Sequence, residues 1–186
     1  MLIGVVLAGG LSTRMGRDKA LLNLAESGWS LLEQAKKLLL ELECDQVLVS
    51  SNHLPNALVD IVPQCGPLSG IHASFHYVKQ QKTLNCEFMF VAIDMPNMTV
   101  EVLKKILVMG RVSRTPFCYR HHYLPLYMPY HESTIRHIDN VLTIKDNTSL
   151  RQMLKSLGAE QSVCDDNNVL LNINHPEQWE NFTKQD

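Results

Sequence analysis

Apolar runs along this chain alternate with stretches that repeat with the period of a helix. Nearly continuous apolar runs, typical of strands covered on both faces, occupy residues 2–7 and 87–93, and residues 46–51 are predicted to form a further strand. The pattern predicts helices over 30–43, 69–79, 99–109, 132–140, 149–157 and 176–182. It also predicts shorter strands over 57–62, 115–119, 123–128 and 169–173. This alternation favours a sheet with helices on both faces.

Capping signals sharpen several of these boundaries. Ser30 with Glu33, and Ser149 with Gln152, have the spacing of a capping box at a helix start. Glycines are typical just beyond a helix end, so Gly110 is expected to close the helix over 99–109 and Gly158 the helix over 149–157. Pro176 suits the first position of the last helix.

Together these elements predict an α/β fold. We expect a three-layer α/β/α sandwich whose sheet is Rossmann-like and mostly parallel, with one antiparallel strand. The 186 residues fit a single domain, 1–186, large enough to bury its own core.

Composition narrows the classes of function. The chain is 45% hydrophobic and 19% charged, as in ordinary globular proteins, and no apolar run is long enough for a membrane span. The apolar start lacks a preceding basic region, so we expect a strand instead of a signal peptide, and a cytoplasmic protein. A net charge of -2 argues against a nucleic-acid partner. The five widely spaced cysteines contain no Cys-x-x-Cys pair, so they are expected to be free thiols.

The first strand runs directly into a glycine-rich, cation-bearing loop. Gly9 and Gly10 let backbone N–H groups approach an anion, while Arg14 and Lys19 bring two cations suited to phosphate oxygens. The loop follows neither the Walker pattern nor the dinucleotide-binding glycine pattern. A tight turn without ligand would also use two glycines, but the two cations favour a nucleoside triphosphate.

Polar residues also follow the other predicted strands. Ser50, Asp94 and the segment 172–174 each come at a strand's carboxyl end, where open α/β sheets collect their ligands. The carboxylate of Asp94 suits Mg²⁺ with waters completing the coordination shell. The alternative for Asp94 is a cap on the turn before Pro96.

The glycine loop resembles the signature of the nucleotidylyltransferases related to molybdenum cofactor guanylyltransferase. It reads Leu7-Ala-Gly-Gly-Leu-Ser-Thr-Arg-Met-Gly-Arg-Asp-Lys19 and holds every fixed position of that signature. Three later segments occur in the family's order: Gly66-Pro67-Leu68-Ser69-Gly70, Ile93-Asp94-Met95-Pro96 and Asn172-Ile173-Asn174-His175-Pro176-Glu177. The resemblance therefore extends over essentially the whole chain and implies a fold of the nucleotide-diphospho-sugar transferase type.

The resemblance also implies an activity, a cofactor and a set of residues. The activity is transfer of GMP from GTP to molybdenum-bearing molybdopterin, with Mg²⁺ as cofactor and pyrophosphate as second product. Catalytic positions match Arg14, Lys19 and Asp94, and Asp94 matches the metal ligand. Nucleotide-binding positions match Leu7, Ala8, Gly9, Gly10, Lys19, Ser50, Gly66, Pro67, Leu68 and Asp94. Acceptor-binding positions match Asn172 and Asn174, although Asn174 could equally cap the last helix. Expected protein partners are molybdoenzymes or other cofactor-biosynthesis proteins, and the expected state is a monomer or weak homo-oligomer.

Two departures from the family pattern affect the prediction of which nucleotide base the protein selects. The aspartate that usually precedes Gly-Pro-Leu, and is used toward guanine, is absent, since Pro63, Gln64 and Cys65 fill that stretch. An asparagine usual at the end of the second strand corresponds to Ser50. Two alternatives stay open: transfer of another nucleotide, such as CMP from CTP, to molybdopterin or a sugar phosphate, and nucleotide binding without turnover.

One histidine pair stands apart from these motifs. His72 and His76 lie four residues apart on a predicted helix and could share a metal ion. The sequence pattern offers no third ligand, so we expect two ordinary helix histidines.

Overall fold

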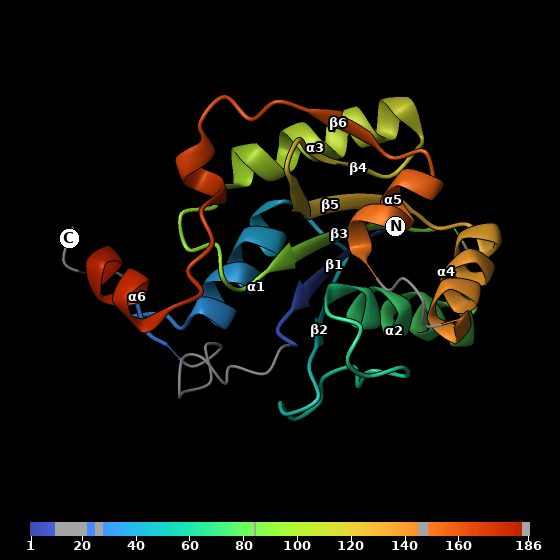
Figure 1. Cartoon of the computed structure of the whole chain (residues 1–186), viewed down its shortest axis with the longest axis horizontal. Coiled ribbons are helices and arrows are strands. Elements are labelled where there is room, and N and C mark those ends of the chain that lie inside the picture. The colour runs from blue at the N-terminus through green and yellow to red at the C-terminus, as the bar shows by residue number, and fades with distance from the viewer. Residues whose placement is uncertain (10–21, 25–27, 84, 145–148, 184–186) are drawn as a thin grey trace.

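The computed structural model describes residues 1–9, 22–24, 28–83, 85–144 and 149–183. Within them, six strands form one sheet in the order β2-β1-β3-β5-β4-β6 (Figure 1). The strands are β1 (Leu2–Leu7), β2 (Gln46–Ser50), β3 (Glu87–Ala92), β4 (Phe117–Tyr119), β5 (His122–Pro129) and β6 (Glu160–Ser162). β5 is antiparallel to both neighbours, whereas the other pairs are parallel. The predicted sheet with one antiparallel strand is confirmed.

Helices cover both faces of this sheet. They are α1 (Leu31–Glu41), α2 (Pro67–Gln80), α3 (Val100–Ser113), α4 (Glu132–Ile144), α5 (Leu150–Ser156) and α6 (Pro176–Thr183). α1 and α3 contact each other and the same face of the sheet, while α2 lies against β1 and β2 and contacts α4 (Figure 1). The three-layer α/β/α prediction is therefore confirmed. No helix in the described part of the chain is both long and apolar enough to cross a bilayer.

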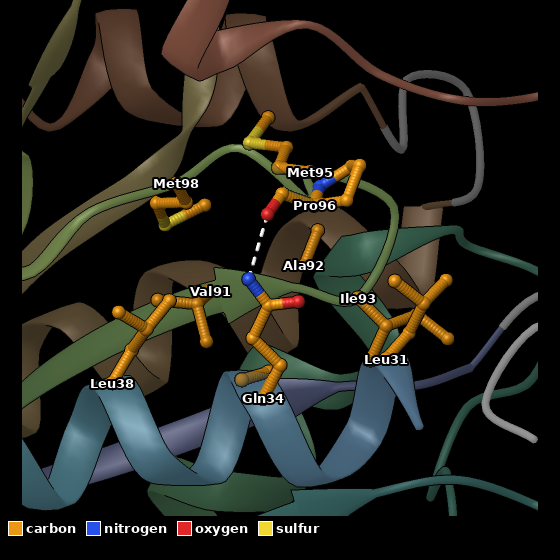
Figure 2. A pocket seen from close by; sticks show the side chains of 10 residues that line it. Leu31, Gln34, Leu38, Val91, Ala92, Ile93, Met95, Pro96 and Met98 are labelled. Carbon is orange, nitrogen blue, oxygen red and sulfur yellow. Dashed lines mark hydrogen bonds between the residues drawn. The ribbon is translucent and has the colours of Figure 1, made fainter. Parts of the chain in front are cut away.

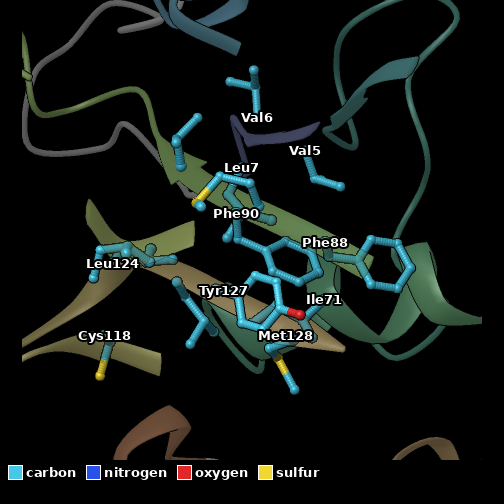
Figure 3. Close-up of a cluster of buried hydrophobic side chains, with 14 of the residues drawn as sticks. Val5, Val6, Leu7, Ile71, Phe88, Phe90, Cys118, Leu124, Tyr127 and Met128 are labelled. Atoms are coloured by element: carbon cyan, nitrogen blue, oxygen red, sulfur yellow. The ribbon is translucent and has the colours of Figure 1, made fainter. Parts of the chain in front are cut away.

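The core is built around β3, the central apolar strand expected from the sequence. Phe88 and Phe90 lie on one face of β3, and both are fully buried (Figure 3). Phe75 of α2 packs on them, with ring centroids 4.6 Å from Phe88 and 6.5 Å from Phe90. Burial of these large rings fastens α2 to the sheet.

Two predicted strands are wrong. Residues 57–62 form a single bridge, between Leu58 and Ser50, and the apolar Val59 and Ile61 are mostly exposed, so burial gives little support to a strand there. Residues 169–173 are not a strand either: a 3₁₀ helix spans Asn167–Leu170, where the Asp166 side chain accepts a hydrogen bond from the Asn168 N–H. The edge strand is β6 instead, whose residues Glu-Gln-Ser carry no apolar signal.

Among the predicted helix ends, one is wrong, and one of the two predicted capping boxes is not formed. Gly110 does not end α3, which continues to Ser113 and closes at Arg114 in the left-handed conformation with φ 57°. Ser30 and Glu33 form the predicted capping box, but the Ser149 side chain makes no capping hydrogen bond. Gly158, with φ 68°, follows the end of α5 as expected.

Candidate functional site

Strand register gathers the predicted polar segments at one edge of the sheet. Leu7, the last residue of β1, pairs with Ser50 of β2 and with Ala92 of β3. The residues after each strand therefore leave the sheet side by side, which places Gly9 and Asp94 at the same edge. The Ala8 N–H donates to the Ser50 carbonyl oxygen at 2.9 Å, and this hydrogen bond holds together the segments that follow β1 and β2, which we call the exits of these strands.

The first turn of α2 packs directly onto these exits. A Cβ atom at Gly70 would lie 2.5 Å from the Ser50 Oγ and 2.7 Å from the Leu7 Cδ2, so only glycine permits this approach. Gly66 precedes the helix with φ 58°, and Pro67 occupies its first turn. The N–H groups at the start of α2 are thereby held beside the ends of β1 and β2.

The predicted nucleotide-binding residues separate into two groups by exposure. Gly9, Gly66 and Pro67 are exposed at the edge of the sheet. Leu7, Ala8, Ser50 and Leu68 are buried. The second group therefore has a supporting position, in which buried side chains hold the loops at this edge of the sheet.

Asp94 lies in the turn that follows β3, and its side chain is half-buried. Gln34 of α1 fixes this turn, since its Nε2 donates to the Pro96 carbonyl oxygen at 2.7 Å (Figure 2). Around this contact the helix and the turn enclose a small hollow lined by apolar side chains including Leu31, Val91 and Met98. Sequence patterns could not identify Gln34, because its partner is a distant main-chain oxygen.

The chain returns to the same turn from its far end. The Ile173 N–H donates to the Asp94 carbonyl oxygen at 2.8 Å, which brings the flanking Asn172 and Asn174 to the site. The Gln178 side chain accepts hydrogen bonds from the N–H groups of Asn174, at 2.7 Å, and His175, at 3.0 Å. Gln178 therefore contributes the side-chain cap at the entry to α6.

The loop before α2 contains an acidic residue that is held in place. Asn52 Nδ2 donates to the Asp60 carboxylate at 2.8 Å, and the Asp60 N–H donates to the Asn52 Oδ1 at 2.9 Å. This reciprocal pair follows β2 and replaces the strand expected there. Asn52 and Asp60 are eight residues apart, and no sequence pattern predicted that they pair.

Three predicted site residues, Gly10, Arg14 and Lys19, lie outside the described residues. Among the described ones, Asp94 offers a carboxylate of the kind Mg²⁺ binds, at the same edge of the sheet as Gly9. A half-buried carboxylate on a turn fixed from two sides fits a metal ligand.

The fold is shared with known nucleotidyltransferases. A molybdopterin-guanine dinucleotide biosynthesis protein A from Archaeoglobus fulgidus superposes with a TM-score of 0.66 at 20% identity, covering 100% of this chain and 98% of that one. The 2-C-methyl-D-erythritol 4-phosphate cytidylyltransferase from Thermus thermophilus gives 0.69 at 13% identity, covering 100% and 98%. At these identities the likeness is one of fold.

Sequence comparison is more specific. A molybdenum cofactor guanylyltransferase from Xanthomonas euvesicatoria is 33% identical over 181 residues, which cover 95% of this chain and 91% of that protein. A probable enzyme of the same name from Mycolicibacterium paratuberculosis is 29% identical over 185 residues, covering 93% and 90%. The model of the MobA-like NTP transferase domain matches residues 4–163. The chain therefore belongs to the family defined by the MobA-like NTP transferase domain.

Proposed function

We propose that this protein transfers GMP from GTP to molybdenum-bearing molybdopterin, producing molybdopterin guanine dinucleotide and pyrophosphate. One observation carries the proposal: the exits of β1 and β3, the start of α2 and the segment around Ile173 meet at one edge of the sheet. Relatives that match over nearly their whole length bear the name of this activity.

The proposed reaction is a single displacement at phosphorus. A phosphate oxygen of the acceptor attacks the α-phosphorus of GTP, the new P–O bond forms, and the bond to the bridging oxygen of pyrophosphate breaks. The acceptor phosphate is already an anion, so no protein base is needed. Bound Mg²⁺ would supply positive charge at the phosphate oxygens.

Each group of residues has a proposed role in this reaction. Asp94 would hold the metal, and Arg14 with Lys19 would stabilise the charge that develops on pyrophosphate. Gly9 and the start of α2 would present N–H groups to phosphate oxygens. Asn172 and Asn174, which flank the residue hydrogen-bonded to Asp94, would contact the acceptor.

The test is a pyrophosphate-release assay with Mg²⁺, molybdenum-loaded molybdopterin and each nucleoside triphosphate in turn. We expect release with GTP and a dinucleotide product of matching mass. Release with CTP alone would replace this proposal by the cytidylyl alternative, which the missing aspartate before Gly66 motivates. Nucleotide binding without release from any triphosphate would contradict transfer altogether.

Site variants test the assigned roles. Asp94→Asn and Lys19→Ala should each lower kcat/KM by about 100-fold or more, because the first weakens the hold on Mg²⁺ and the second removes a cation that stabilises developing charge on pyrophosphate. Asp165→Ala and Lys104→Ala provide charge-matched controls at exposed positions outside the proposed site. Unfolding curves like that of the wild type would establish that the variants fold. Full activity in Asp94→Asn would refute the metal-ligand role.

A further inference from the structure

The histidine pair on α2 meets a carboxylate from another helix. His72 and His76 lie one turn apart, and the Nε2 atom of each contacts the Oδ1 of Asp139 on α4, at 2.7 Å and 2.8 Å. The two rings are arranged edge to face, with centroids 4.5 Å apart. Both imidazoles thus point toward one carboxylate oxygen.

These three side chains have the donor set of a transition-metal site. The His72, His76 and Asp139 ligand atoms all lie within 4.8 Å of one another. Two imidazole nitrogens with one carboxylate oxygen suit Zn²⁺, which commonly takes three protein ligands and a water. Hard cations such as Mg²⁺ prefer an all-oxygen set, so the cluster favours a different ion from the one proposed at Asp94.

The orientation of the rings fixes which nitrogens would bind. His72 is buried and its Nε2 faces the cluster, while its Nδ1 has no hydrogen-bond partner among the described residues. The side chains of His76 and Asp139 are 26% and 39% exposed, which leaves one side of the cluster open to an ion and a water. The site is therefore neither sealed nor fully solvated.

Binding of Zn²⁺ would require only small changes in the distances between the three ligand atoms. Ligands on a tetrahedral Zn²⁺ at about 2.0–2.1 Å lie about 3.3 Å from one another. The nitrogen-to-oxygen distances, now 2.7 Å and 2.8 Å, would have to lengthen by about 0.6 Å to admit the ion. The two Nε2 atoms, which lie within 4.8 Å of each other, would likewise have to come to about 3.3 Å, by rotation of the partly exposed His76 and Asp139 side chains.

The carboxylate is also in the charge state that a metal requires. An aspartate side chain ordinarily titrates at about 3.9, so a carboxylate at this position is expected to be an anion at neutral pH. A cation placed between the three side chains would therefore meet one compensating charge.

We propose that His72, His76 and Asp139 form a transition-metal site, of the Zn²⁺ class, that clamps α4 to α2. The site lies between α2 and α4, on the face of the sheet opposite α1 and α3, and it uses none of the residues assigned to the nucleotide site. It is thus distinct from the proposed nucleotide site and does not depend on the proposed function. Because α2 also supports the exits of β1 and β2 through Gly70, a bound ion would stabilise that support.

The test measures metal binding directly on the full chain after treatment with a chelator. Titration with Zn²⁺ should give one site that His76→Ala and Asp139→Asn each weaken tenfold or more. His131→Ala, which removes an exposed imidazole just before α4, and Asp94→Asn should keep wild-type affinity for this site. Asp139→Asn preserves the shape of a partly exposed side chain, so it is expected to fold normally.

Two further readouts separate this cluster from the cysteines. Co²⁺ should give visible bands without a thiolate charge-transfer band, and Zn²⁺ should raise the melting temperature of the wild type but not of Asp139→Asn. Absence of binding by the wild type, a thiolate band, or equal affinity in His76→Ala and Asp139→Asn would each overturn the proposal.

Discussion

Gly110 shows how one missing side chain positions a helix on the sheet. A Cβ atom at this position would overlap the ring of Tyr127 on β5 and lie 2.6 Å from its Cγ. The ring cannot move aside easily, because Tyr127 is buried and its hydroxyl donates to the Glu87 carboxylate at 2.8 Å. The sequence suggested a helix stop, but the glycine serves a close approach between α3 and β5.

Gly110→Ala should therefore destabilise the protein, although alanine is the better helix former. Intrinsic helix propensity favours the change by about 1 kcal/mol, whereas overpacking of a well-filled core costs about 1–3 kcal/mol. The severity of the overlap with Tyr127 places the cost at the upper end, so we expect a net loss of about 1–2 kcal/mol in urea unfolding. Val112→Ala, at a 77% exposed site of the same helix, should cause no such loss. A Gly110→Ala protein as stable as the wild type would rule out the close-approach explanation.

At the scale of elements, the two predicted capping boxes behave differently. At α1 the Ser30 hydroxyl accepts from the Glu33 N–H at 3.2 Å, and the Glu33 carboxylate accepts from the Ser30 N–H at 2.8 Å. Hydrogen bonds from the Ser30 backbone and then from its side chain lower the pKa of Glu33. At α5 the same sequence spacing yields no side-chain bond from Ser149.

Ser30→Ala should consequently lower the free energy of unfolding by about 1 kcal/mol, the usual value of an N-cap side chain. Ser149→Ala is the matched control, since it makes the same chemical change at a helix start without breaking a capping bond. We expect its effect to be clearly smaller in the same unfolding experiment. Equal losses in both variants would mean that the observed box does not stabilise α1.

For the molecule as a whole, the sequence predicted the helices and strands that carry their own apolar pattern. The buried runs that became β1 and β3 and the periodic stretch of α1 were recognisable because each carries its own burial signal. β6 was missed because three polar residues join the sheet only by pairing with β4. The same limit applies to the functional residues. The polar residues that follow strands were predicted from the sequence, whereas the contacts of Asp139 with His72 and of Gln34 with Pro96 depend on long-range packing.

Buried thiols link the stability of the whole molecule to alkaline pH. Burial raises the pKa of Cys44 to about 12 and the pKa values of Cys86 and Cys118 to about 11. In the unfolded chain a cysteine thiol has a pKa of about 8.5. Below that pH both states keep these protons and the contribution to stability is complete. Above it the unfolded chain has lost protons that the native state retains, so stability falls as pH rises toward the native pKa values.

We therefore expect the free energy of unfolding, measured in urea with a reductant present, to fall between about pH 8.5 and about pH 10. Each such thiol contributes a slope of up to about 1.4 kcal/mol per pH unit. Cys118→Ala should remove one thiol's share of the slope, whatever it costs in stability at neutral pH, because Cys118 is fully buried. Cys65→Ala, which removes a thiol outside the core, is the matched control. If Cys118→Ala and the wild type lost stability at the same rate with pH, burial of this thiol would not be the cause.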